Sequence, residues 1–235
     1  METIDAIILA GGLGTRLREV INDLPKVLAP IDRKPFLDIL LSFLSKNNDI
    51  NKVVLAVGHL SNKIIDRYEN CGAYGFEILF SAEKELLGTG GAIKKALKYT
   101  ETENVLVLNG DSYIEVNIED LFAAHKKNSA SMTIVLKEIE NAARYGSVVL
   151  AGNNRVISFE EKKPGIQRGY VNAGIYLLKK ELFDNIEENK VLSLERDLLP
   201  GFIEKPLYGY VSHGKFIDIG IPEAYEKSHD YLKEV

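Results

Sequence analysis

A glycine-rich loop follows the first apolar segment of the chain. Three glycines stand at positions 11, 12 and 14 of the segment Leu9–Leu17, which continues with Thr15 and Arg16. Because glycine has no Cβ, backbone amides in such a loop can approach a phosphate group closely. The guanidinium of Arg16 has a planar shape that matches phosphate oxygens. Lys26, directly after Pro25, adds a second cation, so the pattern predicts a polyphosphate site.

Other interpretations of this loop fit the residues less well. A Walker A loop ends in Gly-Lys-Ser or Gly-Lys-Thr, and this loop does not. A dinucleotide-binding fingerprint would need glycines at 12, 14 and 17, but position 17 holds Leu17. A glycine-rich turn without any ligand remains the simplest alternative, and Lys26 taken alone would be typical of a solvated loop.

Two aspartates could supply a metal site. Asp111 follows an apolar segment that ends at Asn109-Gly110, and Asp218 follows the apolar pair Phe216-Ile217. Magnesium prefers a few carboxylates together with phosphate oxygens and water. Each aspartate taken separately could equally serve a turn or a helix cap, which is the commoner use of this residue.

The elements that must position these residues alternate between strand and helix. Short apolar runs predict buried strands at Ile4–Ala10, Lys52–Val57 and Val105–Asn109. Helical spacing of apolar residues predicts a helix from Pro35 to Leu44, and residues 60–69 and 90–99 also suit helices. This alternation predicts βαβ units, and therefore an α/β fold with a mainly parallel sheet.

The second half of the chain is richer in strands. The sequence predicts that these strands extend the parallel sheet into a mixed one and that a helix over Pro222–Leu232 follows; the strands are Ser131–Lys137, Gly146–Leu150, Val156–Glu160, Tyr170–Leu178 and Tyr208–Ser212. We expect a single domain over residues 1–235. Hexapeptide repeats are absent from the sequence, so no C-terminal β-helix is expected.

Composition narrows the class of protein. Hydrophobic residues make up 46% of the 235 residues and charged residues 27%, which favours a packed globular protein. The net charge of -5 argues against a nucleic-acid partner, which requires a basic face. The apolar run Ala6–Ala10 is too short for a signal segment or a membrane span, so we expect a cytoplasmic protein without a membrane partner. Neither the single cysteine, Cys71, nor the histidines suggest catalysis, and all four histidines are interpreted as surface or structural residues: His59, His125, His213 and His229.

Together these motifs resemble the sugar-1-phosphate nucleotidyltransferases. The likeness is strongest in Gly11–Leu17 followed by Pro25-Lys26, and it extends from Ala6 to about Leu232. It implies a Rossmann-like, three-layer α/β/α fold of the GT-A-like kind, with a nucleotide-binding part over about 1–115 and a sugar-binding part over about 116–235. It also implies that Arg16 and Lys26 grip the triphosphate and the departing pyrophosphate. The implied nucleotide-binding residues are Leu9, Ala10, Gly11, Gly12, Gly14, Thr15, Arg16, Lys26, Leu87, Gly88, Thr89, Asn109 and Asp111.

The same resemblance assigns the metal and the sugar phosphate. It implies that Asp111 and Asp218 hold Mg²⁺, that Glu161 accepts hydrogen bonds from sugar hydroxyls and that Lys162 binds the sugar phosphate. The implied sugar-phosphate-binding set is Gly110, Tyr145, Gly146, Glu161, Lys162, Asn172 and Asp218. A solvated charge run around Glu161 and ordinary turn chemistry at Gly146 and Asn172 are the alternatives.

The implied reaction transfers a nucleoside monophosphate to a sugar 1-phosphate and releases pyrophosphate. The second pKa of a phosphate monoester is about 6, so the attacking oxygen is already largely ionised at neutral pH and needs no general base. Catalysis is then mostly positioning and charge stabilisation, for which the implied catalytic residues are Arg16, Lys26, Asp111 and Lys162.

Within the family, the resemblance is greatest to guanylyltransferases that act on D-glycero-α-D-manno-heptose 1-phosphate. It rests on Asn109–Ser112, Arg144–Val148, Ser193–Pro200 and Phe216–Pro222. It implies that GTP is the nucleotide and that GDP-heptose for bacterial surface glycans is the product. The alternatives are a mannose-1-phosphate guanylyltransferase, a uridylyl or thymidylyl transferase acting on another hexose 1-phosphate, and a non-catalytic nucleotide-sugar sensor. The sequence does not indicate the oligomeric state.

Overall fold

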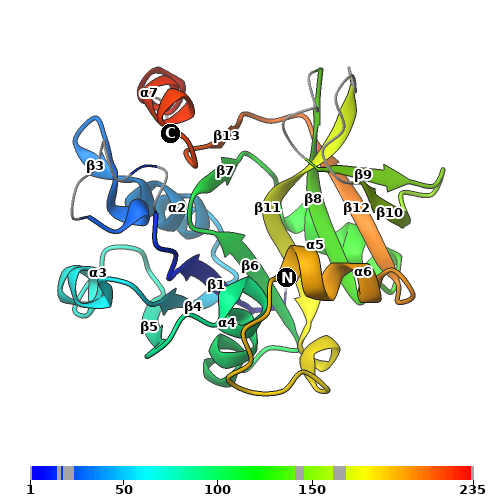
Figure 1. Cartoon of the computed structure of the whole chain (residues 1–235), viewed down its shortest axis with the longest axis horizontal. Coiled ribbons are helices and arrows are strands. Elements are labelled where there is room, and N and C mark those ends of the chain that lie inside the picture. Colours follow the sequence, from blue (N-terminus) through cyan, green and yellow to red (C-terminus); the bar gives the residue numbers. More distant parts are fainter. Residues whose placement is uncertain (1, 15–16, 18–23, 141–145, 161–167, 234–235) are drawn as a thin grey trace.

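A nine-stranded mixed sheet runs through the described residues of the protein (Figure 1). The structure is a computed structural model of the chain, and it describes residues 2–14, 17, 24–140, 146–160 and 168–233. The strands follow the order β10-β9-β11-β6-β1-β4-β5, with β8 paired to β11 and β12 paired to β8. Their bounds are β1 Ile4–Ala10, β4 Ile50–Val57, β5 Glu77–Ala82, β6 Asn104–Asn109, β8 Met132–Ile139, β9 Ser147–Leu150, β10 Val156–Glu160, β11 Gly169–Lys179 and β12 Leu207–Ser212.

The central strands are buried on both faces. Along β1, Ala6 and Ile8 belong to one hydrophobic core and Ile7 to the other, because successive side chains of a strand point to opposite faces. This double burial explains why β1 is a continuous apolar run rather than an alternating one.

Helices cover both faces and complete three layers. The first core lies under α2 (Phe36–Ser45), α3 (Ser61–Tyr68), α5 (Ile118–Lys127) and α7 (Pro222–Tyr231). The second lies under α4 (Gly88–Ala96), the π-helical turn η6 (Leu194–Leu198) and α6 (Leu199–Phe202). Short 3-10 turns complete the helical elements: η2 Lys26–Leu28, η3 Leu97–Tyr99 and η5 Lys180–Phe183.

A change of direction in the strand order places a crevice beside β1. The chain moves outward from β1 to β4 and β5, then returns to the other side of β1 as β6, and all these pairs are parallel. In open α/β sheets, ligands bind beyond the carboxyl ends of the strands at such a point. The crevice therefore lies between the residues that follow β1 and those that follow β6.

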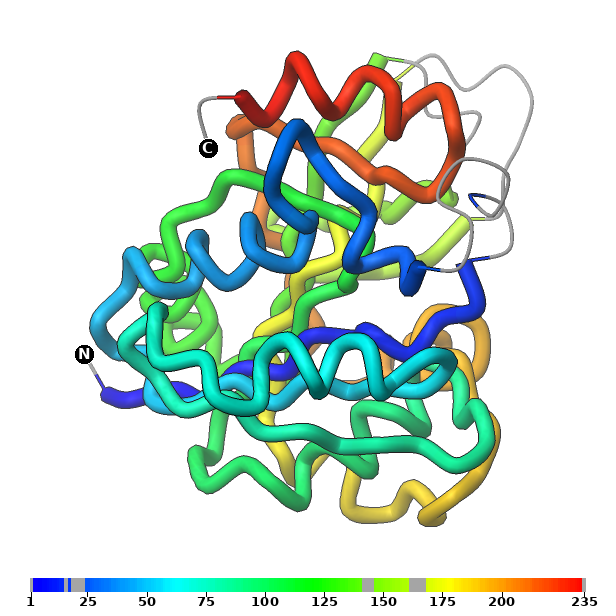
Figure 2. The backbone as a smooth tube through the Cα atoms, turned by 90° about the vertical axis from the view of Figure 1, so that its left-hand side faces the viewer, coloured from blue at the N-terminus to red at the C-terminus, as the bar shows by residue number. Residues whose placement is uncertain are grey.

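The second half of the sheet is largely antiparallel. Strand β11 pairs antiparallel with β6, β8 and β9, whereas β12 runs parallel to β8. Two small pairings lie outside the main sheet: β2 (Pro30–Ile31) with β3 (Lys34–Pro35), and β7 (Ser112–Ile114) with β13 (Phe216–Asp218). Figure 2 shows α7 lying beside the β2–β3 hairpin, which is far away in sequence, and the Tyr225 hydroxyl donates to the Pro30 carbonyl at 2.6 Å.

The predicted three-layer α/β/α architecture with a mixed sheet is confirmed. Strand β1 has the predicted bounds, β4 begins two residues earlier than expected, and residues 90–99 divide into the end of α4 and η3. Several elements were not predicted, and the longest of them are β5 and α5. Their sequences are only partly apolar because β5 is an edge strand and α5 exposes much of its surface. No helix among the described residues has the length and apolar character needed to span a membrane.

His125 is buried between α5 and the sheet, as expected for a structural histidine. Its Nδ1 lies 2.9 Å from the Thr133 hydroxyl and its Nε2 lies 3.2 Å from Asn104 Oδ1. A neutral ring, with one donor and one acceptor nitrogen, satisfies both contacts. Burial, with a smaller contribution from the charge of Lys179, lowers the pKa of His125 to about 4.

This burial predicts a loss of stability in mild acid. The unfolded chain takes up a proton on His125 near pH 6.5, whereas the folded protein takes it up only near pH 4. Stability is therefore lost as the pH falls through this window, by about 2 kcal/mol between pH 7.5 and pH 5. Urea unfolding at both pH values measures it, with His125→Gln as the non-titrating control. An equal loss in wild type and H125Q would contradict the assignment.

Candidate active site

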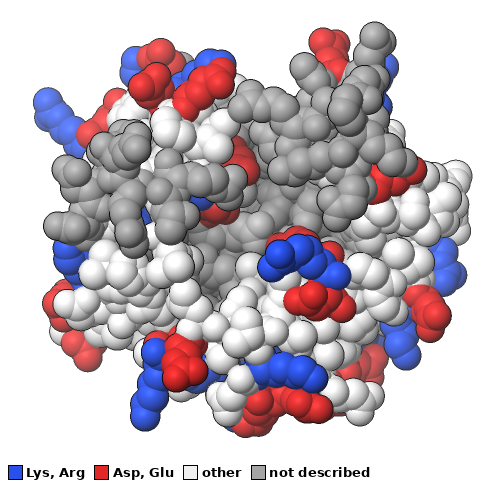
Figure 3. All heavy atoms as spheres, in the orientation of Figure 1, with Lys and Arg blue, Asp and Glu red and all other residues white. Residues whose placement is uncertain are grey.

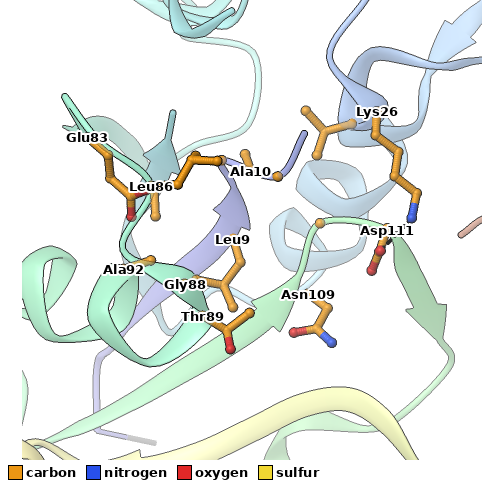
Figure 4. A pocket seen from close by; sticks show the side chains of 15 residues that line it. Leu9, Ala10, Lys26, Glu83, Leu86, Gly88, Thr89, Ala92, Asn109 and Asp111 are labelled. Atoms are coloured by element: carbon orange, nitrogen blue, oxygen red, sulfur yellow. Dashed lines mark hydrogen bonds and ion pairs between the residues drawn. The ribbon is translucent and has the colours of Figure 1, made fainter. Parts of the chain in front are cut away.

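A pocket opens at the crevice beside the carboxyl ends of β1 and β6 (Figure 4). Its volume is about 260 Å³. The lining comes from the ends of β1 and β6 with the residues that follow them, from η2, β4 and the start of α4, and from the segment 83–86 between β5 and α4. The residues are Leu9, Ala10, Gly11, Gly12, Lys26, Val27, Ala56, Glu83, Leu86, Gly88, Thr89, Ala92, Asn109, Gly110 and Asp111.

Gly110 holds β6 close to β1 at the floor of this pocket. Its amide donates to the Leu9 carbonyl at 3.0 Å. A Cβ at this position would lie 2.3 Å from that same carbonyl oxygen and 2.7 Å from Val27 Cγ1. A side chain is therefore excluded, and the backbone that carries Asp111 is held against the first glycine loop.

Lys26 and Asp111 form an ion pair at one end of the pocket. The Lys26 ammonium lies 2.6 Å from Asp111 Oδ2, and the two side chains are 13% and 35% exposed. Figure 4 shows Lys26 descending from η2 toward the aspartate that follows β6. A partly exposed pair of this kind can exchange its partners for charged groups of a ligand, because water has not been fully removed from it.

The small β7–β13 pairing brings Asp218 to the same place. Asp218 is the register partner of Ser112, and the Ile219 amide donates to the Asp111 carbonyl at 2.9 Å. A Cβ on Gly220 would lie 2.7 Å from Asp218 Oδ1 and 3.2 Å from Lys26 Nζ, so both groups border the same space beside Gly220. The two aspartates, far apart in sequence, therefore share one end of the crevice.

Asp111 and Asp218 are the described residues of this cleft that could hold a hard divalent cation such as Mg²⁺. Both carboxylates are hard oxygen ligands, and the Lys26 ammonium shows that a cation is already accommodated against Asp111. In the part of the chain that the structure describes, no three His, Cys, Asp or Glu side chains gather as a metal cluster. Two carboxylates with further oxygens from phosphates and water are the set that Mg²⁺ usually takes.

A second, wider pocket continues from the first. Its volume is about 550 Å³, and it shares Asn109 and Asp111 with the first pocket. The rest of its lining is Ser112, Gly146, Ser147, Val148, Phe159, Glu160, Val171, Asn172, Glu195, Arg196, Leu199, Pro200, Phe216 and Asp218. One continuous cleft therefore has Asp111 at the junction of its two compartments.

Glu83 lies at the end of the first pocket opposite the ion pair (Figure 4). Its Oε2 accepts from the Leu87 amide at 3.2 Å, while its Oε1 is buried without a hydrogen-bond partner. Burial raises the pKa of this carboxyl group, although the Leu87 amide and the charge of Lys95 oppose the shift. An unpaired buried acceptor is costly, so the position is suited to a ligand that donates hydrogen bonds.

The glycines at the start of α4 have a packing role. A Cβ on Gly88, Gly90 or Gly91 would lie 2.5, 2.7 or 2.4 Å from an atom of the segment 190–198. The Gly90 amide donates to the Leu192 carbonyl at 2.8 Å, so this segment is bound directly to the helix N-terminus. These glycines therefore dock the 190–198 segment beside the pocket, while Gly88 and Thr89 also line it.

The structure gathers most of the sequence-predicted residues around the cleft. The first pocket contains all the described residues of the predicted nucleotide set except Gly14 and Leu87. Gly14 packs its backbone against the Lys26 side chain, and Leu87 is buried behind the pocket wall. Gly110, expected on the sugar side, lines the first pocket instead, whereas Gly146, Asn172 and Asp218 line the second. Thr15, Arg16, Tyr145, Glu161 and Lys162 lie outside the described residues.

Sequence reasoning missed Glu83 and Glu195. Glu83 stands in a mixed charge run before Leu87-Gly88-Thr89, where nothing distinguishes it from the exposed Glu85 beside it. Glu195 lies within a segment that carried the family resemblance but had no assigned role. Only the folded chain shows that one carboxylate lines the first pocket and the other lines the second.

Charges on the face shown in Figure 3 are mixed. Acidic and basic side chains are interspersed there, and the described residues of that face show no broad basic surface of the kind that nucleic acids require. The positive charge relevant to a phosphate ligand is instead local, at Lys26 within the pocket.

Comparisons with known proteins agree with this geometry. A family model described as Nucleotidyl transferase matches residues 5–234. The chain is 41% identical over 231 residues to the D-glycero-alpha-D-manno-heptose 1-phosphate guanylyltransferase of Aneurinibacillus thermoaerophilus, covering 98% of this chain and 99% of that protein. It is 40% identical over 222 residues to the protein of the same name from Campylobacter jejuni subsp. jejuni serotype O:2, covering 94% and 97% of the two chains.

A solved structure matches over the same length. HddC from Yersinia pseudotuberculosis superposes with a TM-score of 0.88 at 35% sequence identity, covering 98% of this chain and 100% of that chain. The same protein complexed with GMP-PN superposes with a TM-score of 0.87. This match confirms the predicted fold at the level of the whole chain.

Proposed function

The chain belongs to the nucleotidyl transferase family, and on this basis we propose that it transfers GMP from GTP to D-glycero-α-D-manno-heptose 1-phosphate. The products are GDP-heptose and pyrophosphate. One observation carries the proposal: the chain is similar over almost its whole length to two guanylyltransferases of this name. The cleft is consistent with it, because a compartment lined by Lys26 and Asp111 adjoins a larger one.

The reaction is an in-line displacement at the α-phosphorus of GTP. An oxygen of the sugar phosphate forms the new bond to this phosphorus. The bond from the α-phosphorus to the oxygen bridging to the β-phosphate breaks, and its electrons leave with pyrophosphate. Repulsion between the two anionic substrates opposes their approach, so the protein must supply positive charge and orientation.

The first pocket is proposed to hold GTP with its phosphates at the Lys26 end. There Lys26 exchanges its contact with Asp111 for the triphosphate and stabilises the charge that builds on the leaving pyrophosphate. Arg16 is proposed to assist it, and Lys162 to bind the sugar phosphate, as the family resemblance implies. Because both pockets share Asp111, the attacking oxygen and the α-phosphorus meet beside that carboxylate.

Asp111 and Asp218 are proposed to hold Mg²⁺, which supplies positive charge against the phosphate oxygens when it is bound. The protein's own contribution is to fix the two carboxylates side by side through the β7–β13 pairing. The sugar ring is proposed to occupy the second pocket. The exposed backbone of Gly146 leaves room for it, and Asn172 could donate and accept hydrogen bonds with its hydroxyls.

Glu83 favours guanine among the bases. The Watson–Crick edge of guanine presents two neighbouring donors, N1–H and the N2 amino group, which a carboxylate can accept together. Uracil and thymine present one donor between two carbonyl oxygens, and those oxygens would face the carboxylate unfavourably. Two observations support this choice: Glu83 lines the end of the pocket opposite Lys26, and its Oε1 has no hydrogen-bond partner in the structure.

The cellular setting follows from the substrates and is part of the same proposal. We place the enzyme in the cytoplasm, where nucleoside triphosphates are made. A nucleotide-activated heptose is the chemical form in which a glycosyltransferase would consume the sugar, so the product is proposed to supply a surface polysaccharide.

Pyrophosphate release from the purified protein tests the function. GTP, UTP, dTTP and CTP are each combined with the 1-phosphates of heptose, mannose and glucose in the presence of Mg²⁺. We expect the highest kcat/KM for GTP with the heptose 1-phosphate. A preference for mannose or glucose 1-phosphate would replace the proposed substrate, and nucleotide binding without turnover on any pair would indicate a sensor instead.

A substitution at Glu83 tests the base assignment. Glu83→Gln replaces one carboxylate oxygen with an amide NH₂ group, which is a donor and would face the N1–H and N2 donors of guanine. We expect kcat/KM for GTP to fall by about 10-fold to 100-fold relative to UTP, because an unpaired buried donor is costly. Steady-state kinetics with both nucleotides measure the ratio. The exposed Glu85→Gln is the matched control, and an unchanged ratio in E83Q would refute base reading by this carboxylate.

A further inference from the structure

A chain of hydrogen bonds joins the two pockets beneath the open cleft. It begins at Thr89, which lines the first pocket on the first turn of α4. The Thr89 hydroxyl donates to Glu195 Oε2 at 2.8 Å and accepts from the Leu194 amide at 2.7 Å. Glu195 itself lines the second pocket, so this first contact already crosses from one compartment to the other.

The second half of the chain runs through a buried tyrosine. The Tyr176 hydroxyl donates to Glu195 Oε1 at 3.2 Å and accepts from Asn172 Nδ2 at 2.7 Å. Asn172 lines the second pocket, and its Oδ1 accepts from the Gly174 amide at 3.0 Å. The β11 register with β8 shifts between Asn172 and Tyr176, the two residues whose side chains contact each other here.

Tyr176 is the buried member of this chain of hydrogen bonds, and it connects Glu195 to Asn172. Its side chain is fully buried, and it is not among the described residues that line either pocket. Burial and the neighbouring Glu195 raise its pKa well above the ordinary value, so the hydroxyl remains protonated as a donor to Glu195. Both oxygens of Glu195 are thereby engaged, with the Ser193 hydroxyl as a further donor to Oε2 at 3.0 Å.

The orientation of each group depends on the next one. Removing a hydroxyl from a buried chain leaves its partners unpaired, and they must turn or admit water to recover a hydrogen bond. Loss of the Thr89 hydroxyl leaves the Leu194 amide without its acceptor and Glu195 Oε2 with Ser193 as its remaining donor. Loss of the Tyr176 hydroxyl removes the partner of both Glu195 Oε1 and Asn172 Nδ2. A change at the nucleotide loop can therefore alter the position of the amide that faces the sugar.

We propose that Glu195 and Tyr176 are positioning residues that couple the two pockets, so that binding of the sugar 1-phosphate depends on Thr89 in the nucleotide pocket. The proposal rests on the proposed function, since it treats the first pocket as the nucleotide site and the second as the sugar site. Coupling between two binding sites is reciprocal. GTP bound against Thr89 therefore raises the affinity for the sugar 1-phosphate, and the sugar 1-phosphate bound against Asn172 raises the affinity for GTP by the same factor.

The experiment compares hydroxyl deletions at the two ends. Thr89→Val, Tyr176→Phe and the double variant are assayed for kcat, for KM of both substrates and for Tm. We expect T89V to raise KM for the sugar 1-phosphate about fivefold or more, although Thr89 lines only the nucleotide pocket. Thr89→Ser keeps the hydroxyl, so its KM for the sugar 1-phosphate should stay at the wild-type value. The double variant should be no worse in this KM than the more affected single variant.

Tyr74→Phe is the matched control for the tyrosine. Its hydroxyl also donates to a carboxylate, Asp38 Oδ1, at 3.2 Å, but Tyr74 does not line either pocket as described here. It should leave both KM values unchanged. If Y176F does not fold, T89V against T89S decides the question, because Thr89 is only half-buried.

Three results would overturn the coupling: a T89V effect on KM for GTP alone, multiplicative effects in the double variant, or a lower Tm with both KM values unchanged. Failure of the proposed function is separate, because it would appear as absent turnover in the wild-type protein in the same assay.

Discussion

An ammonium group and a pair of carboxylates meet at the carboxyl ends of β1 and β6. Lys26 is held 2.6 Å from Asp111, and Asp218 is brought beside them by a short strand pairing. Like-charged carboxylates in one partly buried place repel one another unless positive charge lies between them. Positive charge therefore stabilises this place, and in the structure the Lys26 ammonium supplies it.

Close backbone packing makes that meeting possible. Gly110 lets β6 approach β1 so tightly that no Cβ would fit, which fixes Asp111 relative to the first glycine loop. Gly88, Gly90 and Gly91 do the same for the 190–198 segment, which brings Glu195 to Thr89. In both places glycine serves the approach of one backbone to another. The segments that these glycines bring together also form the wall of the first pocket.

The sequence was most informative where strand and loop follow each other directly. The apolar run ending at Ala10 and the glycines after it predicted both β1 and the first pocket, because local periodicity and turn chemistry determine them. Asp218 could be paired with Asp111 only through family resemblance, since their proximity depends on a three-residue strand, β13, whose partner lies far back in the chain. Glu83 and Glu195 could not be found at all, because their burial arises from tertiary packing around charge-rich segments.

The central claim is that the Asp111 carboxylate organises cations for phosphate chemistry. The most direct test is Mg²⁺-dependent pyrophosphate release by Asp111→Asn, compared with wild type and with the exposed control Asp120→Asn. We expect the Asp111→Asn protein to have an unchanged Tm and a turnover lower by on the order of 100-fold or more at every Mg²⁺ concentration. Full turnover in that variant, with an unaltered Mg²⁺ dependence, would contradict it.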